Sequence, residues 1–186
     1  MSEAEWVEQI ASELRSQPWL KHDGLSVRTR LKVAYGCEIL SYAGEPEPQT
    51  RSFQTDLAVI ETFKDNRWKP RVVVEAKLGS VTTHDAITYS QKAASHRAVH
   101  PYLRYGIMLG HRRDYPLPGR LYRHGAQFDL MISFRKGQPS DIEMTLFVKL
   151  LQVEVAASRT LEKILYESRR KGRDRYTLLH RQLILT

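Results

Sequence analysis

Residues 71–77 read Arg-Val-Val-Val-Glu-Ala-Lys, three consecutive valines followed by an acid and a base two positions apart. An unbroken run of valines is typical of a strand buried in the middle of a sheet. Side chains alternate between the two faces of a strand. One face then carries Val72, Val74 and Ala76, and the other carries Arg71, Val73, Glu75 and Lys77.

The charges of Glu75 and Lys77 are unusual on a strand that otherwise has the composition of a core. The rise per residue places the two side chains about 7 Å apart. Burying them costs several kcal/mol per ion unless they are paired or bound to a metal. An exposed strand end with a weak salt bridge would also explain them, because Glu-x-Lys is a common pattern on its own.

The preceding segment, residues 54–63, brings a second acid toward this strand. Asp56 begins an apolar run, and the turn of Asp, Asn and Pro that follows returns the chain antiparallel into residues 71–77. Asp56 and Glu75 would then converge. Two carboxylates so near each other raise the pKa of one of them or bind a hard divalent cation, magnesium above all.

The remaining elements are predicted from the hydrophobic period and the turn residues. They are a helix over residues 3–16, a strand over 31–42, a loop over 44–52, a helix over 83–97 that begins at a capping box formed by Thr82 and Asp85, a strand over 104–110, a basic loop over 111–126, a strand over 128–134 and a helix from 141 to about 170. The strand, helix and strand between residues 71 and 110 predict a crossover with parallel strands. The last helix is apolar enough to cover the sheet or to meet a partner.

Length and composition limit the class of protein. A chain of 186 residues, 41% hydrophobic and 27% charged, predicts one domain over residues 1–186. No segment is apolar enough to span a bilayer, and the acidic amphipathic start predicts no export, so we expect a cytoplasmic protein without a membrane role. The one cysteine, Cys37, excludes an internal disulfide and a thiolate zinc cage. No Gly-rich phosphate loop is present, so no nucleotide cofactor is expected.

The charge of the chain favours nucleic acid as a partner. The net charge is +8, from 29 Lys and Arg against 21 Asp and Glu. Six arginines lie between His96 and His124 against the single acid Asp114, and a second basic run covers residues 169–175. We expect contacts with the DNA backbone from Arg112, Arg113, Arg120 and Arg123.

The pattern of Asp56 in TDLAVI and Glu75-Ala76-Lys77 in VVVEAK, followed by a helix and a strand, resembles the PD-(D/E)XK nuclease superfamily. The order of elements also matches over about residues 3–110. The resemblance implies an α/β fold, with a restriction-endonuclease-like αβββαβ core, a mixed central sheet flanked by helices and a C-terminal helical extension. It implies that Asp56 and Glu75 are metal ligands and that Lys77 is the catalytic lysine. Gln54-Thr55 stands where many members have a proline.

The resemblance also draws attention to residues outside the two strands. Members often carry a glutamine on the following helix, and Gln91, four residues after Ile87, is expected on the face toward the sheet. An acid of the first helix sometimes completes the metal site. Glu13 is the candidate here, with Glu8 and Glu38 as rivals. His84 and Asp85 could form a general-base pair, although capping explains Asp85 better.

The expected function is therefore that of a DNA endonuclease, restriction-type or related, that depends on Mg²⁺ and for which Mn²⁺ can substitute. A structure-specific repair or end-processing nuclease is the alternative within the same class. A non-catalytic DNA-binding protein that keeps the fold is the alternative outside it, and RNA remains a possible substrate. Because cleaving both strands of a duplex takes two active sites, we expect a homodimer, formed through the apolar segment 141–168.

Overall fold

A five-stranded mixed sheet forms the centre of the computed structural model of this chain, which describes residues 1–111 and 117–167. The strands lie side by side in chain order: β1 (Leu25–Ala43), β2 (Glu45–Thr62), β3 (Trp68–Leu78), β4 (Arg104–Gly110) and β5 (Leu130–Ser133). The first three are antiparallel, whereas β4 is parallel to β3 and β5 is parallel to β4. The predicted crossover with parallel strands is confirmed.

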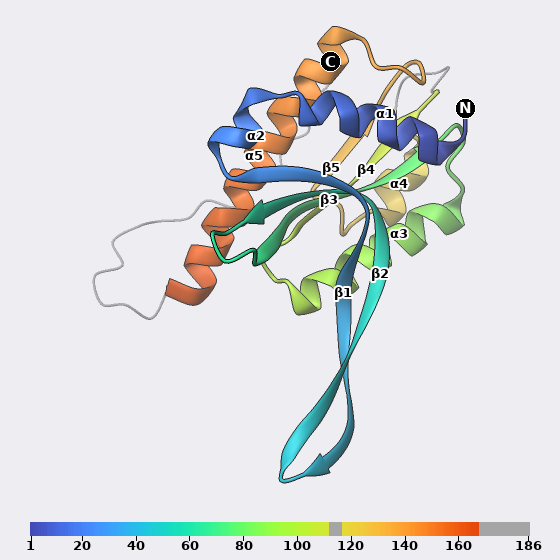
Figure 1. Cartoon of the computed structure of the whole chain (residues 1–186). Helices are drawn as coiled ribbons and strands as arrows, with labels where there is room; N and C mark the ends of the chain where they lie inside the picture. The colour runs from blue at the N-terminus through green and yellow to red at the C-terminus, as the bar shows by residue number, and fades with distance from the viewer. Residues whose placement is uncertain (112–116, 168–186) are drawn as a thin grey trace.

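Helices cover both faces of this sheet (Figure 1). One face packs against α1 (Glu3–Arg15), α2 (Pro18–His22) and α5 (Asp141–Glu167). The other packs against α3 (Thr83–Val99) and α4 (Gly119–His124). The predicted fold class, an αβββαβ core with a mixed sheet flanked by helices and a C-terminal helix, is confirmed. Of the two roles expected for the segment after residue 141, covering the sheet is the one observed.

The alternation expected for residues 71–77 is what divides the core into two layers. Val72, Val74 and Ala76 lie in the cluster under α1 and α5. Val73 lies in the cluster under α3, and Glu75 shares that face of β3. The chain therefore places a buried carboxylate between the sheet and α3.

The register of α3 differs from the one expected from its sequence. Its capping box forms as predicted, with the Thr82 hydroxyl accepting from the Asp85 backbone N–H and the Asp85 carboxylate accepting from that of Thr82. Its buried residues are Ala86, Ser90, Ala93 and His96, whereas Ile87 is 50% exposed. The small side chains allow the helix to approach the sheet closely, and this rotates the larger Ile87 toward solvent.

The segment over residues 44–52, predicted to be a loop, is instead the first half of β2. Only Gly44, with φ of +93°, forms the turn of a long hairpin, in which Tyr42 pairs with Pro46 and Ile39 with Pro48. In this hairpin each strand has one neighbour and one free edge. Proline, which has no N–H to donate, is tolerated on such an edge.

Two further elements depart from the expectations. Pro18 ends the first helical pattern as predicted, but it also begins the short helix α2. Residues 119–124, expected within a basic loop, form α4, which buries Leu121 against the α3 layer. Arg112 and Arg113, predicted to contact DNA, lie outside the described residues.

None of the helices in the described part of the chain combines the length and the apolar character that crossing a bilayer requires.

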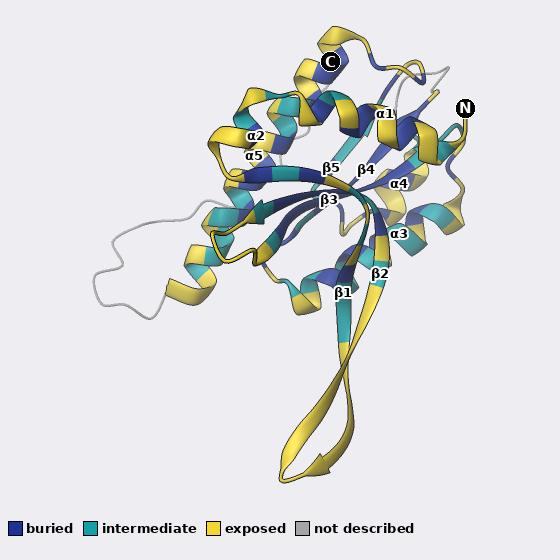
Figure 2. Cartoon of the chain, in the orientation of Figure 1, coloured by how far each residue is buried: buried dark blue, intermediate teal, exposed yellow. Residues whose placement is uncertain are grey.

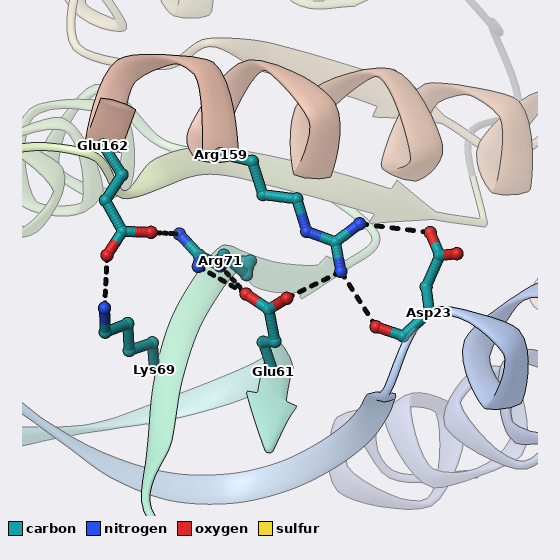
Figure 3. A network of polar contacts seen from close by, with 6 residues as sticks. All are labelled: Asp23, Glu61, Lys69, Arg71, Arg159 and Glu162. Atoms are coloured by element: carbon teal, nitrogen blue, oxygen red, sulfur yellow. Dashed lines mark hydrogen bonds and ion pairs between the residues drawn. The ribbon is translucent and has the colours of Figure 1, made fainter. Parts of the chain in front are cut away.

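A network of ion pairs fastens the C-terminal half of α5 to the ends of β2 and β3 (Figure 3). At its centre is Arg71, which is 3% exposed and pairs with Glu61 and with Glu162. Arg159 joins Glu61 at 2.8 Å to Asp23 at 3.2 Å, and is itself partly exposed. Arg71 is thus a buried cation that depends on two carboxylates from different elements.

Replacing Arg71 with alanine is expected to lower the free energy of unfolding by about 2 kcal/mol, because it leaves two carboxylates at a partly buried site without their shared cation. The matched variant Arg159→Ala removes a more exposed arginine, and is expected to cost at most about 1 kcal/mol. Urea denaturation of both variants measures the difference. Equal losses in the free energy of unfolding would show that the burial of Arg71 does not increase its contribution to stability.

Candidate active site

Asp56 and Glu75 meet on the α3 side of the sheet, one step beyond the pairing of Leu57 with Val74. Asp56 and Glu75 are the next residues beyond that pair, and a side-chain hydrogen bond joins their carboxyl groups. The Asp56 Oδ2 accepts a hydrogen bond from the backbone N–H of Ala76 at 2.8 Å. This contact extends the connection between the strands by one residue and fixes the Asp56 side chain beside Glu75.

The environment of Glu75 strongly favours its neutral form. Burial, with the residue 1% exposed, and next the charge of Asp56 raise the pKa of Glu75 from 4.5 to about 8. A hydrogen bond with Asp56 raises the pKa further, while Lys92 and the Tyr105 hydroxyl oppose the shift. The Glu75 carboxyl therefore favours its protonated form near neutral pH, and a bound cation would take the place of that proton.

Two tyrosines border the acid pair. The Tyr105 hydroxyl on β4 donates a hydrogen bond to Glu75 Oε1, and burial followed by the charge of Glu75 raises the pKa of Tyr105. Burial and the charges of Asp56 and Glu75 also raise the pKa of Tyr89 on α3. Both hydroxyls stay protonated at neutral pH, so Tyr105 serves as a fixed donor that orients the Glu75 carboxyl.

Two lysines approach the acids in different ways. Lys77 follows Glu75 on the same face of β3, and its Nζ lies 3.4 Å from Asp85 at the start of α3, with the side chain 28% exposed. Lys92 on α3 was not singled out from the sequence; its Nζ lies 3.7 Å from Glu75 Oε1, over the rings of Phe53 and Tyr89. Lys92 thus contacts two rings and Glu75, whereas Lys77 pairs with Asp85, and the two side chains are similarly exposed, at 24% and 28%.

The acids proposed to complete the site from the first helix and first strand lie elsewhere. Glu13 accepts a hydrogen bond from Gln138, Glu8 pairs with Arg15, and Glu38 pairs with Arg51 on the hairpin. A different acid of α1, Glu3, reaches the end of β3, where its Oε2 accepts from the backbone N–H of Leu78 at 2.9 Å. Helix α1 begins at the carboxyl end of β3, so its later turns lie too far along the sheet.

Gln91 does not face the sheet, and the expectation that it would do so is wrong. It is exposed, on the side of α3 opposite to Ala86, Ser90 and Ala93. The reason is the rotation of α3 described above, which also exposes Ile87. Lys92, the next residue along the helix, reaches Glu75 instead.

Basic side chains lie near the carboxyl end of β3. Arg120 on α4 donates a hydrogen bond through Nη1 to the carbonyl of Val81 at 2.7 Å, which joins α4 to the segment between β3 and α3. Arg120 and Arg123 are both exposed. They lie on a short surface helix that Arg120 joins to the segment after β3, and no acid in the described part of the chain forms an ion pair with either of them.

The donor set fits a hard divalent cation. Within residues 1–111 and 117–167, no group of three or more His, Cys, Asp and Glu side chains is arranged to hold a metal. The acid pair alone remains, and magnesium is commonly bound by one or two carboxylates while it keeps several waters. Two adjacent acids, one of them with a strongly raised pKa, are the observation that supports this fit.

Comparisons with known proteins add little to this geometry. No protein-family model matches the chain, and no curated protein matches its sequence. One similar solved structure is that of the pre-specific restriction endonuclease BsaWI in complex with DNA, with 13% identity, a TM-score of 0.46 and coverage of 92% of this chain and 68% of that one. A likeness this distant carries no argument, so the function is inferred from the residues of this chain.

Proposed function

We propose that this protein is a magnesium-dependent DNA endonuclease, related to restriction enzymes, with Asp56 and Glu75 as its metal ligands. The observation that carries the proposal is the convergence of these two carboxyl groups in a buried position, which raises the pKa of Glu75 to about 8. Such an arrangement costs stability unless a cation compensates it, and costly clusters of this kind are typical of functional sites.

Each residue of the site has a separate role in the proposed reaction. Asp56 and Glu75 would hold the cation, and Tyr105 orients Glu75 through its hydroxyl. When bound, magnesium would polarise the phosphoryl oxygens and lower the pKa of a water molecule. Lys77, partly exposed at the strand end, would position the attacking water or balance charge on the phosphate. Lys92 would neutralise part of the acid pair in the metal-free protein.

DNA is the proposed substrate because the chain carries a net charge of +8 and because exposed arginines lie on α4, which Arg120 joins to the segment after β3. Arg120 and Arg123 would contact phosphates, and Arg112 and Arg113 are proposed to do so from the neighbouring segment. Affinity should then fall with salt, by about 0.9 logarithmic units per phosphate neutralised. A repair or end-processing nuclease is the second candidate, and Mn²⁺ is expected to substitute for Mg²⁺.

We expect the protein to act as a homodimer in the cytoplasm. Cleavage of both strands of a duplex takes two active sites, which a symmetric dimer supplies. Cys37, the one cysteine of the chain, is free and exposed, which suits a reducing compartment. The inner side of α5 is already used against the sheet, so only its outer side, with Ile142 and Val153 exposed, is available to a second copy.

Cleavage of closed circular plasmid DNA tests the proposal. The wild type is expected to nick or linearise the plasmid with magnesium and to leave it intact with EDTA. Lys77→Ala is expected to lower the cleavage rate by about 10²-fold or more, which is the usual contribution of a positioned proton-transfer group. DNA affinity, measured by fluorescence anisotropy, should change little because only one cation near the phosphate is lost.

Three controls separate the alternatives. Lys149→Ala removes an exposed lysine of α5, far from the acid pair, and should cleave like the wild type. Cleavage of linear but not circular DNA would indicate an end-processing nuclease, because an exonuclease needs an end. Binding without any metal-dependent cleavage would indicate a DNA-binding protein that has kept the fold. Equal rates for wild type and Lys77→Ala would contradict the assigned role of Lys77.

A further inference from the structure

The outer half of the β1–β2 hairpin is a separate surface that the proposed catalysis does not use. We call residues 37–52 the arm, and every one of them is exposed. Figure 2 shows the arm as a continuous exposed ribbon that projects away from the sheet and the helices. Within the described residues it pairs only with itself, strand against strand.

The arm is held firmly where it leaves the body. The Tyr35 ring stacks on that of Phe53 with centroids 3.7 Å apart, across the base of the hairpin. His96 on α3 hydrogen-bonds through Nδ1 with the carbonyl of Ala34 at 3.0 Å. An irregularity in pairing near Tyr35 and another near Leu40 add twist to the ribbon. The arm is therefore anchored at its base, while a two-stranded ribbon on its own is only marginally stable in water.

Large apolar side chains gather near the end of the arm. Ile39, Leu40 and Tyr42 are 42%, 56% and 75% exposed, and they occupy four consecutive positions with Ser41. Single exposed apolar residues are ordinary, but a run of them on a projecting ribbon gains free energy when another surface covers it. The arm thus has the character of an interaction surface.

The charge of the arm restricts its partner. It contains Glu38, Glu45 and Glu47 against the single basic residue Arg51, which pairs with Glu38 at 2.6 Å. Glu45 and Glu47 form no ion pair in the described part of the chain, so they leave the end of the arm negative. Phosphates of nucleic acid would repel this end, and a basic protein surface would attract it.

The rest of this chain carries the opposite net charge. Leaving out the arm's three glutamates and one arginine from the 21 acidic and 29 basic residues leaves 18 acids and 28 bases. The complement of the arm is thus present on every other copy of the chain. In a two-fold dimer each arm would reach the body of its partner, so that the contact is made twice.

We propose that the arm docks, through its acidic and apolar end, on the basic body of a second copy of this chain. This rests on the homodimer proposed above and deepens it by assigning the interface to the arm in place of the outer side of α5. The test below uses neither DNA nor metal, so its outcome is independent of nuclease activity. The interaction should weaken as salt is raised, because opposite charges at the rim of the contact are screened.

Sedimentation velocity of the full chain tests the proposal over a hundredfold range of protein concentration. Two arm variants are used: an apolar variant carrying Ile39→Ser, Leu40→Ser and Tyr42→Ser, and a charge variant carrying Glu45→Lys and Glu47→Lys. The matched control carries Ile142→Ser and Val153→Ser, which removes exposed apolar residues from the outer side of α5 instead. Circular dichroism and thermal melting confirm that each variant is folded.

The wild type is expected to dimerise, with a dissociation constant that rises as NaCl increases from about 0.05 to 0.5 M. Both arm variants should weaken the dimer at least tenfold, and the α5 control should not. A wild type that stays monomeric throughout overturns the proposal. The proposal is also overturned if the dimer dissociates only in the α5 control. It is likewise overturned if the arm variants lower DNA affinity while the dimer persists.

Cys37 supplies a second readout at the base of the arm. As the single cysteine of the chain, and an exposed one, it takes a nitroxide spin label without any other substitution. The label should lose mobility as the wild-type concentration rises, and keep its mobility in the charge variant. A label whose spectrum is identical in both proteins at all concentrations contradicts docking by the arm.

Discussion

Replacing Asp56 by asparagine is expected to lower the rate of magnesium-dependent DNA cleavage by at least about 10³-fold, equivalent to about 4 kcal/mol in the barrier. Asparagine has nearly the same shape, and its carbonyl oxygen can still accept from the Ala76 N–H, so the local structure should survive. What is lost is one of the two negative charges that would hold the cation. Single-turnover cleavage of a labelled duplex measures the effect.

A binding measurement distinguishes this loss from a fault in DNA recognition. Isothermal titration with magnesium should show weaker binding by Asp56→Asn than by the wild type, while DNA affinity with EDTA should be unchanged or higher. The matched variant Asp65→Asn alters an exposed acid of the β2–β3 turn, which pairs with Arg67 rather than with the site. Cleavage by Asp56→Asn within tenfold of the wild-type rate would contradict the role of Asp56 as a ligand.

Replacing Glu75 by glutamine is expected to abolish cleavage but to stabilise the metal-free fold, by about 4–5 kcal/mol at pH 8.5. The glutamine carbonyl can still accept from the Tyr105 hydroxyl, and its amide can donate to Asp56 as the protonated acid does. The variant thus keeps the hydrogen bonds of the neutral form and removes the cost of an ionised carboxylate in a buried position. Urea denaturation in EDTA measures the gain.

The pH dependence of this gain in stability follows from the direction in which the pKa of Glu75 is shifted. Below about pH 4.5 Glu75 is protonated in both folded and unfolded wild type, so its titration contributes no difference. Between pH 4.5 and about 8 the unfolded chain loses the proton that the folded chain retains. The free energy of unfolding of the wild type therefore falls by up to about 1.4 kcal/mol per pH unit. Above about pH 8 both states are ionised and the difference becomes constant.

Comparison of the two proteins at several pH values is therefore the decisive measurement. The stability advantage of Glu75→Gln should grow from pH 5 to pH 8 and then level off, and added magnesium should restore stability to the wild type alone. An advantage that does not vary with pH would mean that Glu75 is not held neutral by its surroundings.

The sequence by itself determined the central strands and the faces they present. The run of valines in residues 71–77 specified a buried strand, and the alternation of side chains placed Glu75 between the sheet and the following helix. The short turn before it specified the antiparallel pairing that brings Asp56 alongside. These features depend on neighbouring residues in the chain and on a period of two, which is why local patterns were sufficient.

The tertiary structure alone decided which side chains from other elements surround the acid pair. Small residues let α3 approach the sheet closely, and this rotation brought Lys92 to Glu75 and turned Gln91 outward. The position of α1 brought Glu3, rather than Glu13, to the end of β3. Helix faces and helix positions depend on packing against distant residues, whose contribution to the free energy is larger than the local preferences that a sequence pattern reports.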